Sequence, residues 1–363
     1  MTDGWRAACP NCERMPDRID GPGRLLLWSP LGHTRGKLLR LLGEAGLAWE
    51  ERDELGALMV GLEAGAPPQL AGRLRPGLSG VELDHVRALY LPGETEPGPG
   101  DYGRVAPLGQ WLAAAEAGWL VDMMAEKRLT SHFQPIVEAR DPSRIFAFEA
   151  LLRGLQPDGG VVGGGPIVGL AAEADLLFQL DLAARRSAVA AFAGQGSGER
   201  RVFINFTPTS IYDPAYCLQT TFRAVEEAGL RPDQVVFEVT ESERVGDMAT
   251  LTDVLGYYRE AGFGVALDDL GSGYASLNLL HVLQPDFVKL DMELIRDVDR
   301  QPHKAALAGK LLEATAAMGI RSVAEGVETP GECQWVREHG ADLIQGFLIG
   351  RPGPELAKSG WTA

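Results

Sequence analysis

The feature that most constrains the fold is a regular alternation of short apolar segments with longer amphipathic ones over the C-terminal two-thirds of the chain. The short segments resemble buried strands, and most of the segments between them have helical apolar spacing. Eight strands with intervening helices, in roughly 240 residues, predict a TIM-type (β/α)8 barrel in the α/β class. A doubly wound open sheet is the main alternative, but no glycine-rich dinucleotide fingerprint follows a first strand. Strands are predicted at His132–Val137, Ile145–Leu152, Val202–Phe206, Val235–Val239, Gly264–Asp268, Phe287–Leu290, Arg321–Glu325 and Leu343–Phe347.

The first 120 residues predict a small α+β domain, separate from a barrel domain at residues 121–363. A strand is expected at Arg24–Trp28, and the apolar spacing of His33–Gly46 predicts a helix that ends at a glycine. A second strand is expected within Val81–Leu91, before the turn-rich segment Pro92–Gly103. A helix over Pro107–Lys127 would connect the two domains. Helices of the barrel domain are predicted at Tyr216–Ala228, Asp247–Ala261, His303–Met318 and Pro330–His339.

Composition limits the classes of function. The formal net charge of −16 argues against non-specific nucleic-acid binding, which depends on basic patches, so no DNA partner is expected. The chain has no apolar run of about 18 residues and no signal-peptide core, so no membrane association and a cytoplasmic location are expected. Cys9 and Cys12 form a CxxC pair without a second CxxC. An incidental pair is therefore favoured over a zinc or redox site, for which His33 would be a distant third ligand.

Polar side chains stand at or near the C-terminal ends of seven apolar segments. A single example would be a strand end that meets solvent. Seven such segments in chain order indicate that the polar groups face one another, because the C-terminal ends of barrel strands converge on one mouth. Carboxylates gathered there repel one another unless cations share the space. The residues are Glu149, Asn205, Glu238, Asp268 with Asp269, Lys289 with Asp291, Glu325 and Gln345.

This set of residues favours a hard divalent ion. Oxygen ligands without histidines at the strand ends suit Mg²⁺ or Mn²⁺ better than zinc, and no HExxH pattern is present. Adjacent carboxylates such as Asp268 and Asp269 can serve two metals, which activate water and neutralise charge on a phosphoryl group. Lys289 would hold that water or stabilise charge. Glycosidase chemistry needs only two carboxylates and leaves the other polar residues without a role.

The segments around these residues are the motifs of a known family. Taken together and in order, they resemble the EAL-domain family of cyclic di-GMP phosphodiesterases over about residues 121–363. The motifs are Phe133-Gln134-Pro135-Ile136, the namesake Glu149-Ala150-Leu151, Asn205, Glu238-Val239-Thr240-Glu241, Asp268-Asp269-Leu270-Gly271-Ser272-Gly273-Tyr274, Lys289-Leu290-Asp291, Ala324-Glu325-Gly326-Val327-Glu328-Thr329 and Gln345-Gly346-Phe347.

The resemblance implies hydrolysis of cyclic di-GMP to linear pGpG with two Mg²⁺ or Mn²⁺ ions per site. It implies one ion bound by Glu149, Asn205, Glu238 and Asp268, and a second held by Asp268, Asp269 and Glu325. Lys289 would contact the attacking water, and Glu325 would act as general base or position the water. Glu241 would anchor the loop Asp269–Ser276, which couples dimerisation to metal binding in the family. Substrate contacts would come from Gln134, Leu152, Arg153, Gln345 and Pro352, with Gln345 also supporting the metal-bound water.

The departures from the family pattern are small. Leu270 stands where an aromatic residue is usual, and no metal-site or catalytic position is lost. That argues against the alternative of a cyclic di-GMP receptor without catalysis. A third reading is an unrelated barrel enzyme that acts on another phosphodiester. The first 120 residues carry no GGDEF-type cyclase motif, so a regulatory or sensory domain is expected there, and the family implies a homodimer formed through the EAL domain.

Overall fold

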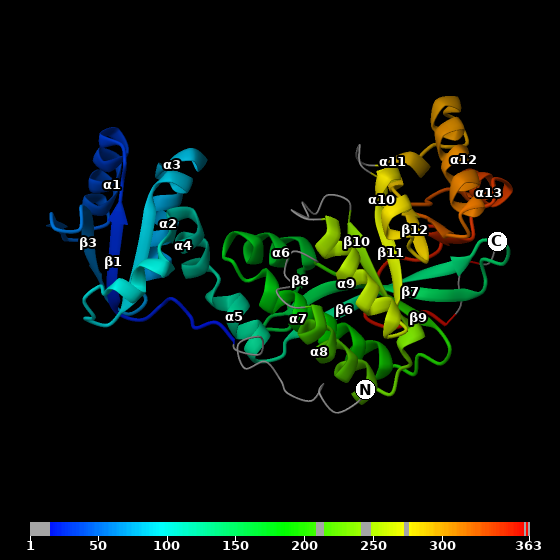
Figure 1. Cartoon of the computed structure of the whole chain (residues 1–363), viewed down its shortest axis with the longest axis horizontal. Helices are drawn as coiled ribbons and strands as arrows, with labels where there is room; N and C mark the ends of the chain where they lie inside the picture. The colour runs from blue at the N-terminus through cyan, green and yellow to red at the C-terminus, as the bar shows by residue number, and fades with distance from the viewer. Residues whose placement is uncertain (1–14, 208–213, 241–247, 272–275, 359–360, 362–363) are drawn as a thin grey trace. The chain divides into compact units, whose positions relative to one another are not determined.

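The computed structural model of the chain describes residues 15–207, 214–240, 248–271, 276–358 and 361. It forms two compact units (Figure 1). The barrel unit contains Leu129–Gly164 and Asp181–Ala363, and the N-terminal unit contains Arg14–Arg128 together with Gly165–Leu180. The chain therefore leaves the barrel unit after Gly164 and returns to it at Asp181. Among the described residues, no helix combines the length and apolar character that crossing a bilayer requires.

The N-terminal unit is built on a five-stranded antiparallel sheet of order β2-β3-β1-β4-β5. Its core joins strand residues such as Leu25 and Val60 to Leu38 and Leu42 of helix α1, all fully buried. The elements are β1 (Gly23–Trp28), α1 (Gly32–Glu44), β2 (Trp49–Arg52), β3 (Ala57–Leu62), α2 (Ala66–Leu74), η1 (Arg75–Gly77), α3 (Gly80–His85), β4 (Arg87–Pro92), η2 (Pro99–Arg104), β5 (Ala106–Pro107), α4 (Leu108–Glu116) and α5 (Gly118–Ala125). Helix α6 (Gly164–Glu173) and the first residues of α7 (Leu177–Ala193) complete the unit.

The predicted α+β character of this region is confirmed, and the strand expected within Val81–Leu91 is β4. The first half of that segment is helix α3, which was not predicted. The reason for this helix is the capping box of Ser79 and Glu82, whose side chains satisfy backbone groups at the start of the helix. The predicted helix over Pro107–Lys127 is two helices, which meet at Ala117.

The barrel unit closes eight strands in the order β6-β14-β13-β12-β11-β10-β9-β7, and β6 pairs with β7 to complete the ring. The short strand β8 extends from β7 outside this ring. The predicted barrel is confirmed, and each predicted strand coincides with an observed one. The strands are β6 (Leu129–Glu138), β7 (Ile145–Leu155), β8 (Val161–Gly163), β9 (Arg201–Asn205), β10 (Val235–Thr240), β11 (Gly264–Leu270), β12 (Phe287–Leu290), β13 (Arg321–Ala324) and β14 (Leu343–Gln345).

The barrel differs from eight parallel strands at its first strand. β6 is antiparallel to both β7 and β14, while the other neighbouring strands of the ring are parallel. The cause is the short connection from Glu138 to Ile145, in which Asp141 accepts hydrogen bonds from the amide and hydroxyl of Ser143. A turn of this length joins antiparallel strands, whereas a parallel crossover needs a dozen or more residues.

Helices surround the barrel strands on the outside (Figure 1). They pack on it through a large apolar core that includes Phe148, Phe237 and Tyr258. The helical elements are α7, α8 (Pro214–Glu227), η4 (Pro232–Gln234), α9 (Met248–Glu260), α10 (Ser276–Leu283), α11 (Met292–Ile295), α12 (Pro302–Ala317) and α13 (Pro330–Glu338).

Inside the barrel, an apolar layer crosses the full width of the ring. Each of the eight strands contributes one residue to it, and these side chains form a separate buried cluster. Because successive strand residues point to opposite faces, the residue two positions along each strand also points inward. The apolar layer is therefore flanked by a second inward-pointing layer at the mouth, the end of the barrel where the parallel strands finish, and the base is the end where they begin. The members of the apolar layer are Ile136, Ala147, Phe203, Val236, Ala266, Phe287, Val323 and Leu343.

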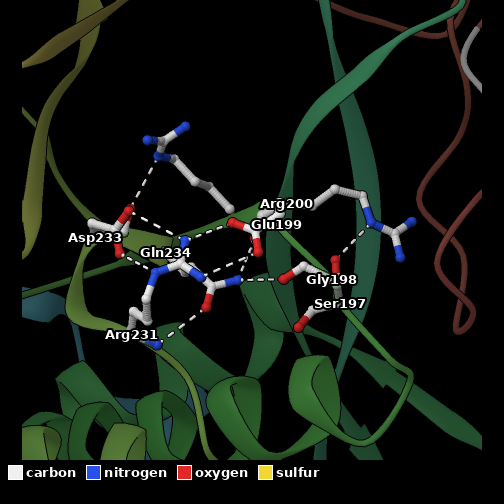
Figure 2. Close-up of polar contacts among 8 residues, drawn as sticks. Ser197, Gly198, Glu199, Arg200, Arg231, Asp233 and Gln234 are labelled. Atoms are coloured by element: carbon white, nitrogen blue, oxygen red, sulfur yellow. Dashed lines mark hydrogen bonds and ion pairs between the residues drawn. The ribbon is translucent and has the colours of Figure 1, made fainter.

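At the base, the starts of β9 and β10 are fixed by a polar network (Figure 2). The buried Gln234 side chain donates to the backbone oxygens of Gly198, at 2.7 Å, and Arg200, at 3.1 Å. Arg231 pairs with Glu199 and with Asp233, each at 2.9 Å. The charged groups of this network are exposed, so it stabilises the strand starts without burying an excess of one charge.

Candidate active site at the mouth of the barrel

The mouth layer of the barrel is polar at every strand. Each of its residues lies two positions from a member of the apolar layer, on the side of the C-terminal ends of the parallel strands. On β6 the order along the chain is reversed, as expected for its antiparallel direction. Strand alternation and barrel closure thus place eight polar side chains at one mouth. They are Gln134, Glu149, Asn205, Glu238, Asp268, Lys289, Glu325 and Gln345.

Lys289 occupies the centre of this layer. Its ammonium nitrogen lies 2.8 Å from oxygens of both Glu238 and Glu325. It also lies 3.2 Å from Asp268 Oδ1 and 3.6 Å from Glu149 Oε2. The Lys289 side chain is 1% exposed, so one buried cation faces four carboxylates. The local charge is therefore strongly negative.

The pKa values of these groups follow from that imbalance. Burial raises the pKa of Glu325 to about 8, and the nearby Asp268 and Glu149 add to the rise while Lys289 opposes it. The same causes raise the pKa of Glu238 well above its ordinary value. Burial alone would lower the pKa of Lys289, but the surrounding carboxylates outweigh it and raise the pKa well above that of a free lysine. The site holds more negative charge than its own cation neutralises.

A second group of acids lies beside the first. Asp268, Asp269 and Glu325 each place a carboxylate oxygen within 4.8 Å of the other two. Asp269 has a φ of 58°, a left-handed conformation within β11, where the pairing with β12 shifts register between Leu267 and Leu270. Its amide donates to Asp268 Oδ1 at 2.9 Å. Burial and the neighbouring Asp268 and Asp291 raise the pKa of Asp269. Asp268 therefore belongs both to the ring around Lys289 and to this outer group.

Amide side chains form the other side of the mouth. Gln345 Nε2 donates to Glu149 Oε2 at 2.6 Å and to Gln134 Oε1 at 3.2 Å. Gln134 in turn donates to the backbone oxygen of Gly350 at 3.2 Å. Asn205 is exposed at the end of β9, and its amide nitrogen lies 3.4 Å from Glu149 Oε1. These contacts orient Glu149 and connect four strands at the mouth, β6, β7, β9 and β14.

The residues present fit divalent cations. All candidate ligands are oxygens, the donors that Mg²⁺ and Mn²⁺ prefer. Glu238 is fully buried, yet its Oε2 has no hydrogen-bond partner among the described residues. A buried carboxylate oxygen without a donor is costly, and an ion would satisfy it. The raised pKa values of Glu238 and Glu325 have the same physical origin, an excess of negative charge.

Comparison with known proteins decides the family. The sequence model described as "EAL domain" matches residues 117–352. This chain belongs to the EAL domain family. The cyclic di-GMP phosphodiesterase NbdA of Pseudomonas aeruginosa is 30% identical over 237 residues, which are 64% of this chain and 30% of that protein. The match covers about a third of the length of NbdA and of three other curated relatives.

Solved structures support the same EAL fold. The c-di-GMP-bound form of a standalone EAL protein from Vibrio cholerae O395 is 34% identical, with a TM-score of 0.58, and the match covers 64% of this chain and 95% of that one. BlrP1 of Klebsiella pneumoniae, solved as a calcium and cy-diGMP complex, matches 94% of this chain and 99% of its own, with a TM-score of 0.59. At 24% identity, the second likeness concerns the fold alone.

Within this EAL domain, the predicted metal ligands Glu149, Asn205, Glu238, Asp268 and Glu325 all lie in the mouth layer, and Asp269 lies directly beside it. Lys289, Gln134 and Gln345 are in the same layer. The structure brings these residues together, whereas their individual roles stay predictions.

The other predicted site residues lie outside the mouth layer or outside the residues that the structure describes. Leu152 and Arg153 lie further along β7, and Arg153 donates to the backbone oxygen of Leu152 at 2.7 Å. Pro352 adjoins Gly353, whose backbone pairs with Phe133 of β6. Glu241, Cys9, Cys12 and residues 272–275 of the predicted loop lie outside the described residues.

Sequence reasoning did not single out the residues behind the mouth. Asp181 and Arg185 form a buried ion pair on α7 at 2.7 Å, and Asp181 accepts a hydrogen bond from the backbone just after β9. Their spacing of four residues is a readable signal of a helical ion pair. Nothing in the spacing indicates that the pair is buried or that it contacts the strand carrying Asn205.

Proposed function

We propose that the barrel unit hydrolyses cyclic di-GMP to linear pGpG with two divalent ions, Mg²⁺ or Mn²⁺. The observation that carries this proposal is the set of four carboxylates around the single buried Lys289, extended by Asp269. Glu149, Asn205, Glu238 and Asp268 would hold one ion, and Asp268, Asp269 and Glu325 the other. The similarity to a cyclic di-GMP phosphodiesterase and to an EAL structure with c-di-GMP bound supports this choice of substrate.

The chemistry divides between the ions and the chain. Bound ions would acidify a water and neutralise charge on the phosphoryl group. Water oxygen bonds to phosphorus, the bond from phosphorus to the 3′ oxygen breaks, and that oxygen takes a proton. Glu325 is placed to accept the proton of the water, because its carboxylate lies beside those of Asp268 and Asp269, with which it would hold an ion. Lys289 orients Glu325 and Glu238 from 2.8 Å and offsets part of their repulsion.

Recognition of the two guanine nucleotides would use Gln134, Leu152, Arg153, Gln345 and Pro352. An arginine suits a phosphate because its planar group can donate two parallel hydrogen bonds. We further propose a regulatory role for the region before the barrel, with the sequence divided near residue 120. Glu241 would anchor the loop after Asp269, a homodimer would form through the EAL domain, and the protein would work in the cytoplasm without a DNA partner.

Product analysis tests this function. The purified full chain is incubated with cyclic di-GMP in Mg²⁺, in Mn²⁺, in Ca²⁺ and in a chelator, and the nucleotides are separated by chromatography. We expect pGpG with Mg²⁺ or Mn²⁺ and none with the chelator. Ca²⁺ should inhibit, because its longer and looser coordination does not suit a site for a smaller ion.

A Glu325→Gln variant provides the matched control, because it keeps the side-chain volume and removes the proton acceptor. It should lose at least about 100-fold in turnover, the scale of a general base. Tight binding of cyclic di-GMP without turnover in any metal would favour a receptor. Faster turnover of another cyclic nucleotide would overturn the substrate.

A further inference from the structure

Helix α7 carries a buried ion pair that the proposed chemistry does not use. Arg185 Nη2 lies 2.7 Å from Asp181 Oδ2, and the two side chains are 3% and 7% exposed. A buried pair is weak support for stability, because removing two charges from water offsets most of their attraction. Such a pair is of interest when it fixes a geometry that a less polar contact would leave loose.

The pair connects three helices. Arg185 Nη1 donates to Thr221 Oγ1 of α8 at 2.9 Å and to the hydroxyl of Tyr258 of α9 at 2.8 Å. The guanidinium group also lies 5.2 Å from the ring centre of Phe206. A planar guanidinium can hold several partners at fixed angles, so Arg185 fixes the position of the Asp181 carboxylate relative to α8 and α9.

Asp181 in turn restrains the backbone just after β9, the strand that ends at Asn205. Its Oδ1 accepts the backbone N–H of Thr207 at 3.1 Å, two residues after Asn205. The residue between them, Phe206, donates its backbone N–H to the carbonyl of Glu238 at 2.9 Å. Its ring lies 5.2 Å from that of Tyr258. The backbone after Asn205 is therefore held by α7 on one side and by β10 on the other.

Asn205 itself is the least restrained member of the mouth layer. Its side chain is exposed, and its contact with Glu149 is long, at 3.4 Å. An amide oxygen is neutral, so it binds an ion through correct placement more than through charge. Its contribution to ion binding therefore depends on the backbone that carries it.

We propose that Asp181, held by Arg185, is a positioning residue that sets the affinity of the mouth for a divalent ion through the placement of Asn205. This inference rests on the proposed function, because it assumes that Asn205 is an ion ligand. Neither Asp181 nor Arg185 would touch the ion or the substrate.

Direct binding of Mn²⁺ to the full chain, measured by calorimetry without substrate, tests the proposal. Asp181→Ala removes the acceptor for the Thr207 amide, whereas Asp181→Asn keeps an acceptor oxygen of the same size. We expect Asp181→Ala to weaken Mn²⁺ binding about tenfold, at the low end for residues that orient metal ligands. Asp181→Asn should restore affinity to within about threefold, by the same reasoning.

The matched control acts at the opposite end of the same strand. Gln234 is 3% exposed and donates to the backbone oxygens of Gly198 and Arg200, before β9 (Figure 2). Gln234→Ala should lower the melting temperature without changing Mn²⁺ affinity. If Asp181→Ala does not fold, Arg185→Lys replaces it, because lysine keeps the charge and loses the planar fork. Arg185→Lys should also weaken Mn²⁺ binding.

The possible outcomes distinguish failure of the positioning role from failure of the proposed metal site. Normal Mn²⁺ affinity in a folded Asp181→Ala or Arg185→Lys protein would overturn the positioning role alone. Equal weakening by Asp181→Asn and Asp181→Ala would overturn the hydrogen bond to Thr207 as the cause. A wild-type protein that binds no Mn²⁺ would instead overturn the metal site in the proposed function, and this inference with it.

Discussion

The two ends of the barrel differ in the burial and the balance of their charged side chains. At the mouth, the buried Lys289 faces four carboxylates within 3.6 Å. At the base, Arg231 lies between Glu199 and Asp233 (Figure 2). Arg321 pairs there with Glu138 and stacks on Phe146. The apolar layer lies between the ends. The contrast teaches that exposed or partly exposed ion pairs can serve the fold, whereas a buried excess of one sign marks where a ligand ion is needed.

The largest expected effect comes from breaking the imbalance at the mouth. Lys289→Met keeps a long side chain but leaves four carboxylates without a cation. We expect loss of turnover by at least about 100-fold, since the residue orients the proposed base. The free energy of unfolding in a chelator should fall by about 3–5 kcal/mol, as for other buried pairs that lose one partner. Nucleotide chromatography and urea unfolding measure the two effects, and wild-type turnover would remove Lys289 from the site.

A smaller effect concerns pH and the removal of ions. The pKa of Glu325 is raised to about 8 in the folded protein, so unfolding releases its proton between that pH and the ordinary value of 4.5. Stability from this group is fully present below pH 4.5 and is lost as pH rises through 8. In a chelator, the free energy of unfolding should fall by at most about 1.4 kcal/mol per pH unit for one proton.

Urea unfolding at pH 6 and pH 8.5 measures this slope. Glu325→Gln should reduce it, because the amide does not titrate. Saturating Mn²⁺ should flatten or reverse the slope, since an ion competes with the proton for the carboxylates. A free energy of unfolding that rises with pH in the chelator would contradict an excess of negative charge at the mouth.

The smallest effect is expected at the base. Arg321→Met matches Lys289→Met in chemistry, but Arg321 is partly exposed and loses one ion pair and its stacking on Phe146. We expect about 1 kcal/mol of lost stability and turnover within twofold of wild type. Thermal unfolding measures the change in stability, and nucleotide chromatography measures the turnover. A large loss of activity would show that the apolar layer does not separate the two ends.

The sequence predicted the mouth better than its supports. Strand alternation is local, so residues such as Glu238 and Asp268 were identifiable from their positions in apolar segments. The helix α3 was missed although Ser79 and Glu82 carry the spacing of a capping box. The hairpin between β6 and β7 was missed because the first strand was treated like the other seven.

The network around Arg185 was beyond such reasoning. Its partners Thr221 and Tyr258 are 36 and 73 residues away along the chain, and only packing brings them together. Burial of a charged helix residue is likewise a property of the assembled barrel. Local spacing shows that Asp181 and Arg185 can pair, but tertiary structure determines what the pair holds.

The segment Gly165–Leu180 has a consequence for how such a protein can be recombined. It follows the barrel hairpin in sequence, yet it belongs to the N-terminal unit, where Glu173 pairs with Arg75 and Asp175 accepts from Gln110. Its apolar side chains Ile167 and Ala171 are fully buried. The two units are therefore interleaved along the chain. A single genetic crossover near residue 120 would exchange only part of the N-terminal unit, and a clean exchange would have to carry both stretches together.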